Sequence, residues 1–440
     1  MHNRSTGPDA PAATNDARSN FGPRGWILVF IGMLCFYVGT GAVNDGLNTI
    51  VPMFTERYGW DSGTLLAMSS VSGILSGIGG IFLGVLVNKF GVKKMMLFSI
   101  GLLAVSTFSW GFVKSVPLYF ICLLGCVLAQ GGMGQLGLPI LAGNWFPRKK
   151  GLIMGWVTMG ANVCSATINW LLVGAAALWG FHGGFNSLAV IAIIAFILLA
   201  IFIREYPEQC GCFPDNDASM TKEEAVQIQR ENEKYIKTSP FTVKKLLKTK
   251  QTWQVALYIG AVQMVTGGCV SQLVPTIESY GFTRNYAMAT MTVCAIIGLF
   301  GSYLVGWFDA KYGTKRTILG FQIMTAVLCL FMVLPWKWTV YVAAFLVGIS
   351  MGGSNNLFGS YMIQIFGRYD QKRATTVAFP IYQITRTMGT GFIGVLASRF
   401  GSYSVPYAIL ALLLIVVFFA TWKMNDACIG RHQLSSDNSN

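Results

Sequence analysis

Long runs of apolar residues, separated by short polar turns, dominate this chain. A run of about 20 apolar residues is long enough to cross the hydrocarbon core of a bilayer as a helix. The pattern therefore predicts an all-α membrane protein with twelve transmembrane helices. These helices are predicted at roughly 26–54, 63–87, 95–113, 117–142, 151–175, 184–204, 252–277, 286–308, 315–334, 338–365, 374–397 and 403–424.

The second half of the chain repeats the first at an offset of about 222 residues. The matched elements are Val51-Pro52 with Val274-Pro275, Tyr58-Gly59 with Tyr280-Gly281, Gly84 with Gly306, Gly91 with Gly313, and Gly131-Gly132 with Gly352-Gly353. Tandem membrane halves are how secondary transporters build a site that can face either side. The repeat predicts two six-helix bundles and makes a solute carrier the first hypothesis.

The chain is expected to divide into five segments. They are an N-terminal tail (1–25), a first bundle (26–204), a linker (205–250), a second bundle (251–424) and a C-terminal tail (425–440). The polar tail precedes the first apolar run without an apolar core of its own, so we expect no cleavable signal peptide. The linker is read either as an amphipathic tether at the membrane surface or as a solvated connection.

Composition agrees with a membrane protein. The chain is 53% hydrophobic and 11% charged, with a mean hydropathy of +0.54, whereas soluble domains carry roughly 25% charged residues. Its net charge is +14, but 26 of the 32 lysines and arginines fall in the tails, the linker and the even-numbered loops. This bias retains basic loops in the cytoplasm. We therefore expect a multi-pass protein of the cell membrane with both termini cytoplasmic, and no nucleic-acid partner.

Residues that commonly carry catalysis or bind metal form no pattern here. Most of the ten cysteines lie singly in predicted helices, where small buried thiols are ordinary. The three histidines, His2, His182 and His432, are far apart in the sequence. The sequence therefore predicts no enzyme, no metal site and no cofactor.

The turn after the second predicted helix carries a family signature. Gly84, Asn88, Gly91 and Lys93 fall within a stretch that resembles the G-x-x-x-D-R-x-G-R-R motif of the major facilitator superfamily. The second copy contains Gly306, Asp309, Gly313 and Arg316. The glycines allow close helix approach and a tight turn, while the basic residues can bind helix ends. The resemblance covers essentially the whole chain and implies a twelve-helix fold with alternating-access transport.

Both copies depart from this motif. Asn88 stands where the family has Asp, and Asp309 follows Gly306 by three residues instead of four. A charge-relay gate at these turns is therefore in doubt, and a structural role is the favoured reading.

A second resemblance concerns the fourth predicted helix and the chain that leaves it. Gln130-Gly131-Gly132-Met133-Gly134, the stretch Trp145-Phe146-Pro147-Arg148, and Tyr206-Pro207-Glu208 are similar to the oxalate/formate antiporter and monocarboxylate porter families. The fifth predicted helix lacks the Gly-Pro pair that drug/proton antiporters place there. The resemblance favours carboxylate carriers over drug pumps.

Arg386 is the sharpest candidate for chemistry. It lies about twelve residues into the eleventh predicted helix, about 18 Å from the cytoplasmic end and near the bilayer centre. A cation there costs at least about 3 kcal/mol on insertion scales, so it needs a partner inside the bundle. A carboxylate substrate fits, because guanidinium offers a planar bidentate match. The other reading is a permanent ion pair that locks two helices.

The resemblance adds a constraint on the substrate. The oxalate/formate family carries a basic residue on its eleventh helix, as here, and another on its eighth. The predicted helix 286–308 holds no basic residue, and Arg284 lies at its outer mouth. One fixed positive charge suits a monoanion better than a dianion, so we predict a small monocarboxylate.

Asp45 is the other ionisable residue well inside a predicted helix. Tyr37, Gly41, Asn44 and Asn48 share its face at helical spacing. A buried acid can take up and release a proton during a transport cycle. Asp45 is read as the proton carrier, as the counter-ion of Arg386, or as a polar cap near the outer end of the helix.

Further polar side chains are candidates for the lining of a substrate cavity. They are Gln130, Gln135, Gln263, Asn355, Asn356, Tyr382 and Gln383. By resemblance, helices 1, 4, 7 and 10 of this superfamily face the central cavity. For any one of the amides, a hydrogen bond between helices is an equal alternative to ligand contact.

The sequence thus predicts a secondary active transporter that moves a small organic anion by proton symport or anion exchange. Its expected partners are the carboxylate, the lipid bilayer and, for symport, protons, and a monomer is expected. The alternatives are a sugar-acid or aromatic-acid symporter, and a transporter-like receptor without flux.

Overall fold

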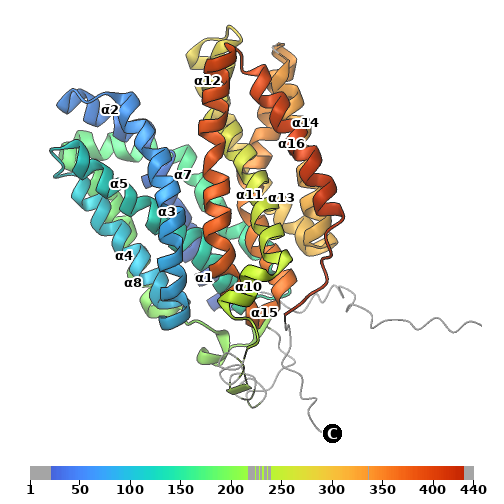
Figure 1. Cartoon of the computed structure of the whole chain (residues 1–440). Coiled ribbons are helices and arrows are strands. Elements are labelled where there is room, and N and C mark those ends of the chain that lie inside the picture. The colour runs from blue at the N-terminus through green and yellow to red at the C-terminus, as the bar shows by residue number, and fades with distance from the viewer. Residues whose placement is uncertain are drawn as a thin grey trace, which may run out of the picture.

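The structure is a computed structural model that describes residues 21–216, 239–334 and 336–430, together with positions 223, 227, 230, 231 and 235. Residues 1–20 and 431–440 of the predicted tails, and most of 217–238 in the predicted linker, lie outside the described part. The described chain is built of helices (Figure 1).

The first half supplies one group of helices. They are α1 (Gly22–Val43), α2 (Leu47–Tyr58), α3 (Ser62–Phe90), α4 (Val92–Trp110), α5 (Val116–Gln130), the π-helix η1 (Gly131–Gly137), α6 (Leu138–Trp145), α7 (Lys150–Trp179) and α8 (Phe181–Phe202). Two 3₁₀ turns, η2 (Pro207–Cys210) and η3 (Pro214–Asn216), follow.

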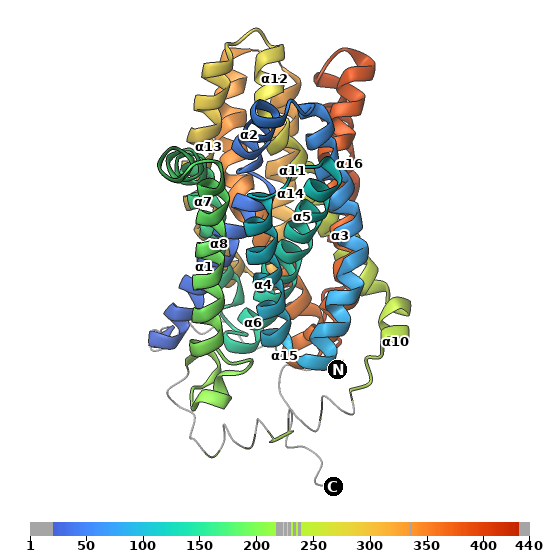
Figure 2. The same cartoon turned by 90° about the vertical axis from the view of Figure 1, so that its left-hand side faces the viewer.

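The second half supplies the other group. It contains α10 (Val243–Lys248), α11 (Lys250–Ser271), α12 (Leu273–Ser279), α13 (Arg284–Tyr312), α14 (Thr314–Val333), α15 (Lys337–Phe400) and α16 (Ser404–Trp422). Within each group the helices pack on one another, and the groups meet where α3 lies along α15 and α7 lies along α13. We call the two groups the first and second bundles. They stand side by side in Figure 1, and Figure 2 views the first bundle face on.

Some predicted spans are interrupted in the structure. The first, 26–54, breaks at residues 44–46 between α1 and α2, and 252–277 breaks at Gln272 between α11 and α12. The spans predicted at 338–365 and 374–397 are the two helical parts of α15, which meet at a break in the helical backbone at Gly367 (φ 67°, ψ 173°). Only glycine adopts such a backbone readily, so the chain reverses its course there without a loop.

The repeat of the sequence is visible in two one-residue turns. Gly91 ends α3 and begins α4 with φ 91°, and Gly313 ends α13 and begins α14 with φ 85°. Residues with a side chain rarely adopt positive φ. A glycine at each position therefore allows two long helices to follow one another directly. Other helix starts use polar caps: the Asp61 carboxylate accepts from the Thr64 backbone N–H at 2.6 Å.

We name the two ends of the molecule by their contents. The linker end holds residues 205–216 and α10, and the far end holds α2 and α12 (Figure 1). Large apolar side chains on the outside of the helices, such as Ile81, Val105 and Val416, are more than half exposed. Eleven described helical segments are long and apolar enough to span a membrane, and lipid is the natural cover for these side chains.

Membrane orientation is tested with two exposed lysines, Lys94 in the first turn of α4 at the linker end and Lys114 in the connection from α4 to α5 at the far end. In a background without cysteines, we expect a membrane-impermeant maleimide to label Lys114→Cys in intact cells. Lys94→Cys should react only after permeabilisation, because basic loops stay in the cytoplasm. The reverse labelling pattern would overturn the predicted orientation.

Candidate functional site

Four neutral polar side chains meet between the bundles, at the middle of the helices. The Gln135 and Gln263 side-chain amides both donate to Asn355 Oδ1, at 3.2 Å and 3.0 Å. The Tyr382 hydroxyl donates to Gln135 Oε1 at 3.4 Å. Gln135 belongs to the first bundle and the other three belong to the second, so this network joins the halves of the protein.

Local structure positions these groups. Gln135 lies in η1, and π-helical turns are rare and are frequently found at functional sites. Glycines let η1 pack tightly: a Cβ on Gly132 would lie 2.2 Å from Ser99 Oγ, and one on Gly137 would lie 2.4 Å from Met96 Cγ. On the other side, the Tyr382 ring stacks on Phe358 with centroids 4.1 Å apart and planes 11° apart. Packing therefore fixes both ends of the Gln135–Tyr382 contact.

Arg386 adds a positive charge beside this network. Its guanidinium carbon lies 6.0 Å from the centroid of the Tyr382 ring, one turn earlier in α15. Its Nη1 is buried and has no hydrogen-bond partner, and no carboxylate of the described residues lies within 4.0 Å. A partly buried cation with an unused donor is an electrostatic site for an anion.

The remaining predicted lining residues are placed differently. Gln383 is 3% exposed, and its Oε1 has no partner in the described structure. The stem of Gln130 packs against Gly39 of α1. Asn356 faces away from the network: its Nδ2 donates to Ser302 O at 3.0 Å and its Oδ1 accepts from Thr158 at 2.7 Å. Both ends of this amide are thus used in the seam between α7 and α13.

Asp45 lies in the break between α1 and α2 instead of inside a continuous helix, and its backbone N–H bonds Thr40 O at 3.1 Å. Its carboxylate accepts a hydrogen bond from Ser165 Oγ on α7. The same hydroxyl lies 3.1 Å from Ala161 O. Among the described residues, no ion pair joins Asp45 to Arg386.

The two motif turns contact the opposite bundle or a helix end. Asn88 Nδ2 donates to Thr376 Oγ1 of α15 at 3.1 Å, and the buried Asp309 carboxylate abuts Gly151 at the start of α7. Lys93 Nζ donates to Ala200 O in the last turn of α8 at 2.7 Å. Gly84 and Gly306 allow close helix crossings, whereas Arg316 is exposed.

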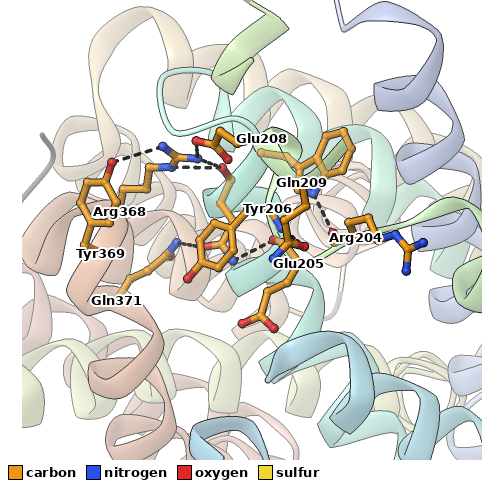
Figure 3. A network of polar contacts seen from close by, with 10 residues as sticks. Arg204, Glu205, Tyr206, Glu208, Gln209, Arg368, Tyr369 and Gln371 are labelled. Atoms are coloured by element: carbon orange, nitrogen blue, oxygen red, sulfur yellow. Dashed lines mark hydrogen bonds and ion pairs between the residues drawn. The ribbon is translucent and has the colours of Figure 1, made fainter. Parts of the chain in front are cut away.

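The linker end carries a buried polar network that the sequence reasoning missed (Figure 3). Arg368 pairs with Glu208 at 2.8 Å, and both side chains are nearly inaccessible, at 4% and 3% exposed. Arg368 Nε and Nη2 also donate to Asn144 O, at 3.1 Å and 2.8 Å. Lys372 Nζ pairs with Glu205 at 2.8 Å. Charges on α15 are thereby tied to α6 and to the chain that leaves α8.

A signal for this network was present in the sequence. Tyr206-Pro207-Glu208 was noted as a family resemblance, and the basic turn at 371–373 matches the one at 148–150. What the sequence could not give was the pairing, because Glu208 and Arg368 lie 160 residues apart. The fold alone brings them together.

Comparison with known proteins places the chain in a family. The profile of the Major Facilitator Superfamily matches residues 28–390. The chain belongs to the major facilitator superfamily. It is therefore a multi-pass membrane transporter, and the predicted twelve-helix facilitator fold is confirmed.

Individual relatives in the superfamily cover most of the chain. The "Probable hexose phosphate transport protein" of Chlamydia trachomatis is 21% identical over 428 residues, which cover 92% of this chain and 91% of the relative. The oxalate:formate antiporter of Oxalobacter formigenes is 26% identical over 344 residues, or 76% of each chain. The solved proton:xylose symporter XylE, bound to 6-bromo-6-deoxy-D-glucose, has a TM-score of 0.71 at 15% identity, covering 90% of this chain and 94% of XylE.

The buried pair at the linker end gives a stability prediction. Glu208→Ala should lower the free energy of unfolding by about 3–5 kcal/mol, because it leaves the Arg368 guanidinium buried without its counter-charge. Glu278→Ala is the matched control, since its pair with Arg284 spans 4.0 Å and the two side chains are 34% and 77% exposed; it should change stability by about 0–1 kcal/mol. Unfolding of the purified proteins in detergent measures both. Equal midpoints for the two variants would contradict the role given to Arg368.

Proposed function

We propose that this transporter moves a small organic anion, a monocarboxylate, by alternating access. The observation that carries the proposal is the unpaired Nη1 of Arg386, placed beside the neutral network of Gln135, Gln263, Asn355 and Tyr382. A guanidinium binds a carboxylate through two parallel hydrogen bonds. The amides and the phenol orient the rest of the molecule without adding charge.

The charge of the site favours a monoanion. Arg386 is the one cation that the described contacts place at this level of the bundle interface, and one fixed charge balances one carboxylate. The names of two relatives mention hexose phosphate, oxalate and formate, which are all anions. These names support an anionic substrate, and the unpartnered Nη1 of Arg386 supports a carboxylate within that class.

Alternating access is supported by where the bundles are joined. Polar cross-bundle contacts run from Lys372–Glu205 and Arg368–Asn144 at the linker end up to Gln135–Asn355 in the middle. Opening the linker end must break these contacts. The two bundles must then rotate against each other along the seams between α3 and α15 and between α7 and α13. We assign the linker end to the cytoplasmic side, so this conformation is closed toward the cytoplasm.

Asp45 is the proposed proton carrier for symport. It lies in the first bundle and bonds to Ser165, while Arg386 lies in the second bundle beside Tyr382. The separate partners favour this role over that of a standing counter-ion. The Ser165 hydroxyl has two acceptors within reach, Asp45 and Ala161 O. It can therefore donate to an ionised Asp45, or turn to Ala161 when Asp45 is protonated.

The anion site is tested at Arg386. In proteoliposomes, Arg386→Ala should lower uptake and exchange of small monocarboxylates by at least about 100-fold, because a buried charge-assisted bidentate pair is lost. Arg386→Lys should retain partial transport, since it keeps the charge and loses the fork geometry. Arg399→Ala is the matched control, because Arg399 lies on the same helix and is exposed at the far end.

Two results would contradict the assignment. One is transport of carboxylates by Arg386→Ala at the rate and affinity of the parent. The other is ligand binding by the parent without any counterflow, which would indicate a receptor without flux.

Proton coupling is tested at Asp45. Asp45→Asn should abolish uptake driven by a proton gradient while sparing exchange of substrate for substrate, because exchange needs no deprotonation step. Asp61→Asn, which alters an exposed helix cap in the same bundle, should leave both activities unchanged. Uptake is measured against external pH in the two variants. If the pH profile of Asp45→Asn matches that of the parent, Asp45 is not the carrier.

A further inference from the structure

The stretch that follows α16, Asn425 to Gly430, is bound to the second bundle. It runs back across the linker end toward α15 (Figure 1). Backbone N–H groups of Ile429 and Gly430 donate to Ile365 O, at 2.8 Å and 3.4 Å. Ile365 lies two residues before the bend at Gly367, where the first part of α15 ends. The last carbonyls of a helix lack partners within it, and this stretch supplies donors for one of them.

Side chains hold the same stretch in place. Asp426 accepts from Gln364 Nε2 at 3.3 Å and lies 3.5 Å from Lys315 Nζ. Lys315 Nζ also donates to Met424 O at 2.7 Å. The motif turn between α13 and α14 is thereby connected to Met424 and Asp426 and, through Asp426, to Gln364 of α15.

Gly430 sits in a space that admits no side chain. A Cβ built there would lie 1.7 Å from the backbone oxygen of Phe366. The neighbour is backbone, so it cannot swing away as a flexible side chain could. Glycine is therefore required for the stretch to reach the bend.

The same stretch also approaches the first bundle. Burial raises the pKa of the Cys428 thiol, and the Lys150 ammonium at the start of α7 opposes that shift through its charge. Directly after the bend come Arg368, Gln371 and Lys372, whose side chains cross to Asn144 and Glu205. The stretch and the cross-bundle contacts thus lie on either side of one backbone bend.

We propose that residues 425–430 form a C-terminal strap, which holds the bend of α15 in the arrangement that closes the linker end. When the strap is in place, the Ile365 carbonyl and Gln364 are fixed, and Arg368 is aimed at Asn144 and Glu208. Opening of the linker end requires the bend to move, which releases the strap. The strap therefore sets the balance between closed and open forms, independently of which solute is carried.

Hydrogen exchange of the full-length protein in lipid nanodiscs tests this proposal. Gly430→Ala should speed amide exchange about fivefold, the effect of one lost hydrogen bond, in residues 424–430 and also in 143–150 and 364–376. Gly320→Ala is the matched control, because a Cβ there meets nothing within 4 Å. Asp426→Ala, which removes the Gln364 and Lys315 contacts without adding a clash, should act in the same direction as Gly430→Ala.

Two results would overturn the strap. In the first, both strap variants speed exchange only in 424–430 and leave 143–150 and 364–376 at the parental rate, which would make the stretch a passive tail. In the second, 424–430 of the parent exchanges as fast as an unstructured peptide. Glu208→Ala provides the reference for direct opening of the linker end, because it breaks the Arg368 pair itself.

Discussion

Hydrocarbon offers no hydrogen-bond partner, and this constraint governs the whole molecule. Helices satisfy their own backbone, so every polar side chain inside the bundles must find a partner there or be left free for a ligand. Most do find one: Thr158, Ser302 and Asn356 bond to one another, and the Arg368 guanidinium is saturated by Glu208 and Asn144. Several buried side-chain atoms of the described residues have no partner, among them Asn162 Nδ2 and Gln383 Oε1, and Arg386 Nη1 is the one that belongs to a guanidinium. This unused donor on a partly buried cation supports the proposed anion site.

The two bundles approach each other through glycine, and this makes a rocking motion possible. Along α3, Gly73, Gly77, Gly80 and Gly84 each leave room for a side chain or the backbone of α15. On the pseudo-symmetric side, Gly155 of α7 lies against Ser302 O and Gly306 of α13. Such seams of small residues gain dispersion energy with few directional bonds, so they tolerate small rotations. Directional bonds between the bundles lie at the linker end, around Gln135, and where Thr158 of α7 bonds to Ser302 of α13, and a change of state can make or break them.

Much of this architecture could be read from the sequence because it is local. The apolar runs predict the helices. The recurrence of Gly91 as Gly313 indicates the repeat, since a one-residue turn with positive φ needs glycine at both places. Arg386 was identifiable because a charge in an apolar run is conspicuous. The breaks at residues 44–46 and at Gln272 were missed, since the predicted apolar spans continue across them. Asn356 and the pairing of Arg368 with Glu208 depend on which helices become neighbours, and no local pattern encodes that.

The two arginines in the second part of α15 have different surroundings, and these surroundings determine what each charge can do. Arg368 and Arg386 share one helix and one kind of side chain, and they lie about 27 Å apart at 1.5 Å per residue. Arg368 sits at the bend, where the chain leaving α8 brings Glu208 to it and the α6 carbonyl of Asn144 completes its shell. Removing a partner from so complete a shell costs stability, so this pair fits the proposed closure of the linker end. Arg386 lies where the facing helices present Gln135, Gln263 and Asn355, which are polar and uncharged. Neutral amides do not neutralise a guanidinium, so in the proposed site its charge remains available to a substrate. Had any of these amides been a carboxylate, the site would be a second permanent ion pair, and a mobile anion would have to compete with it.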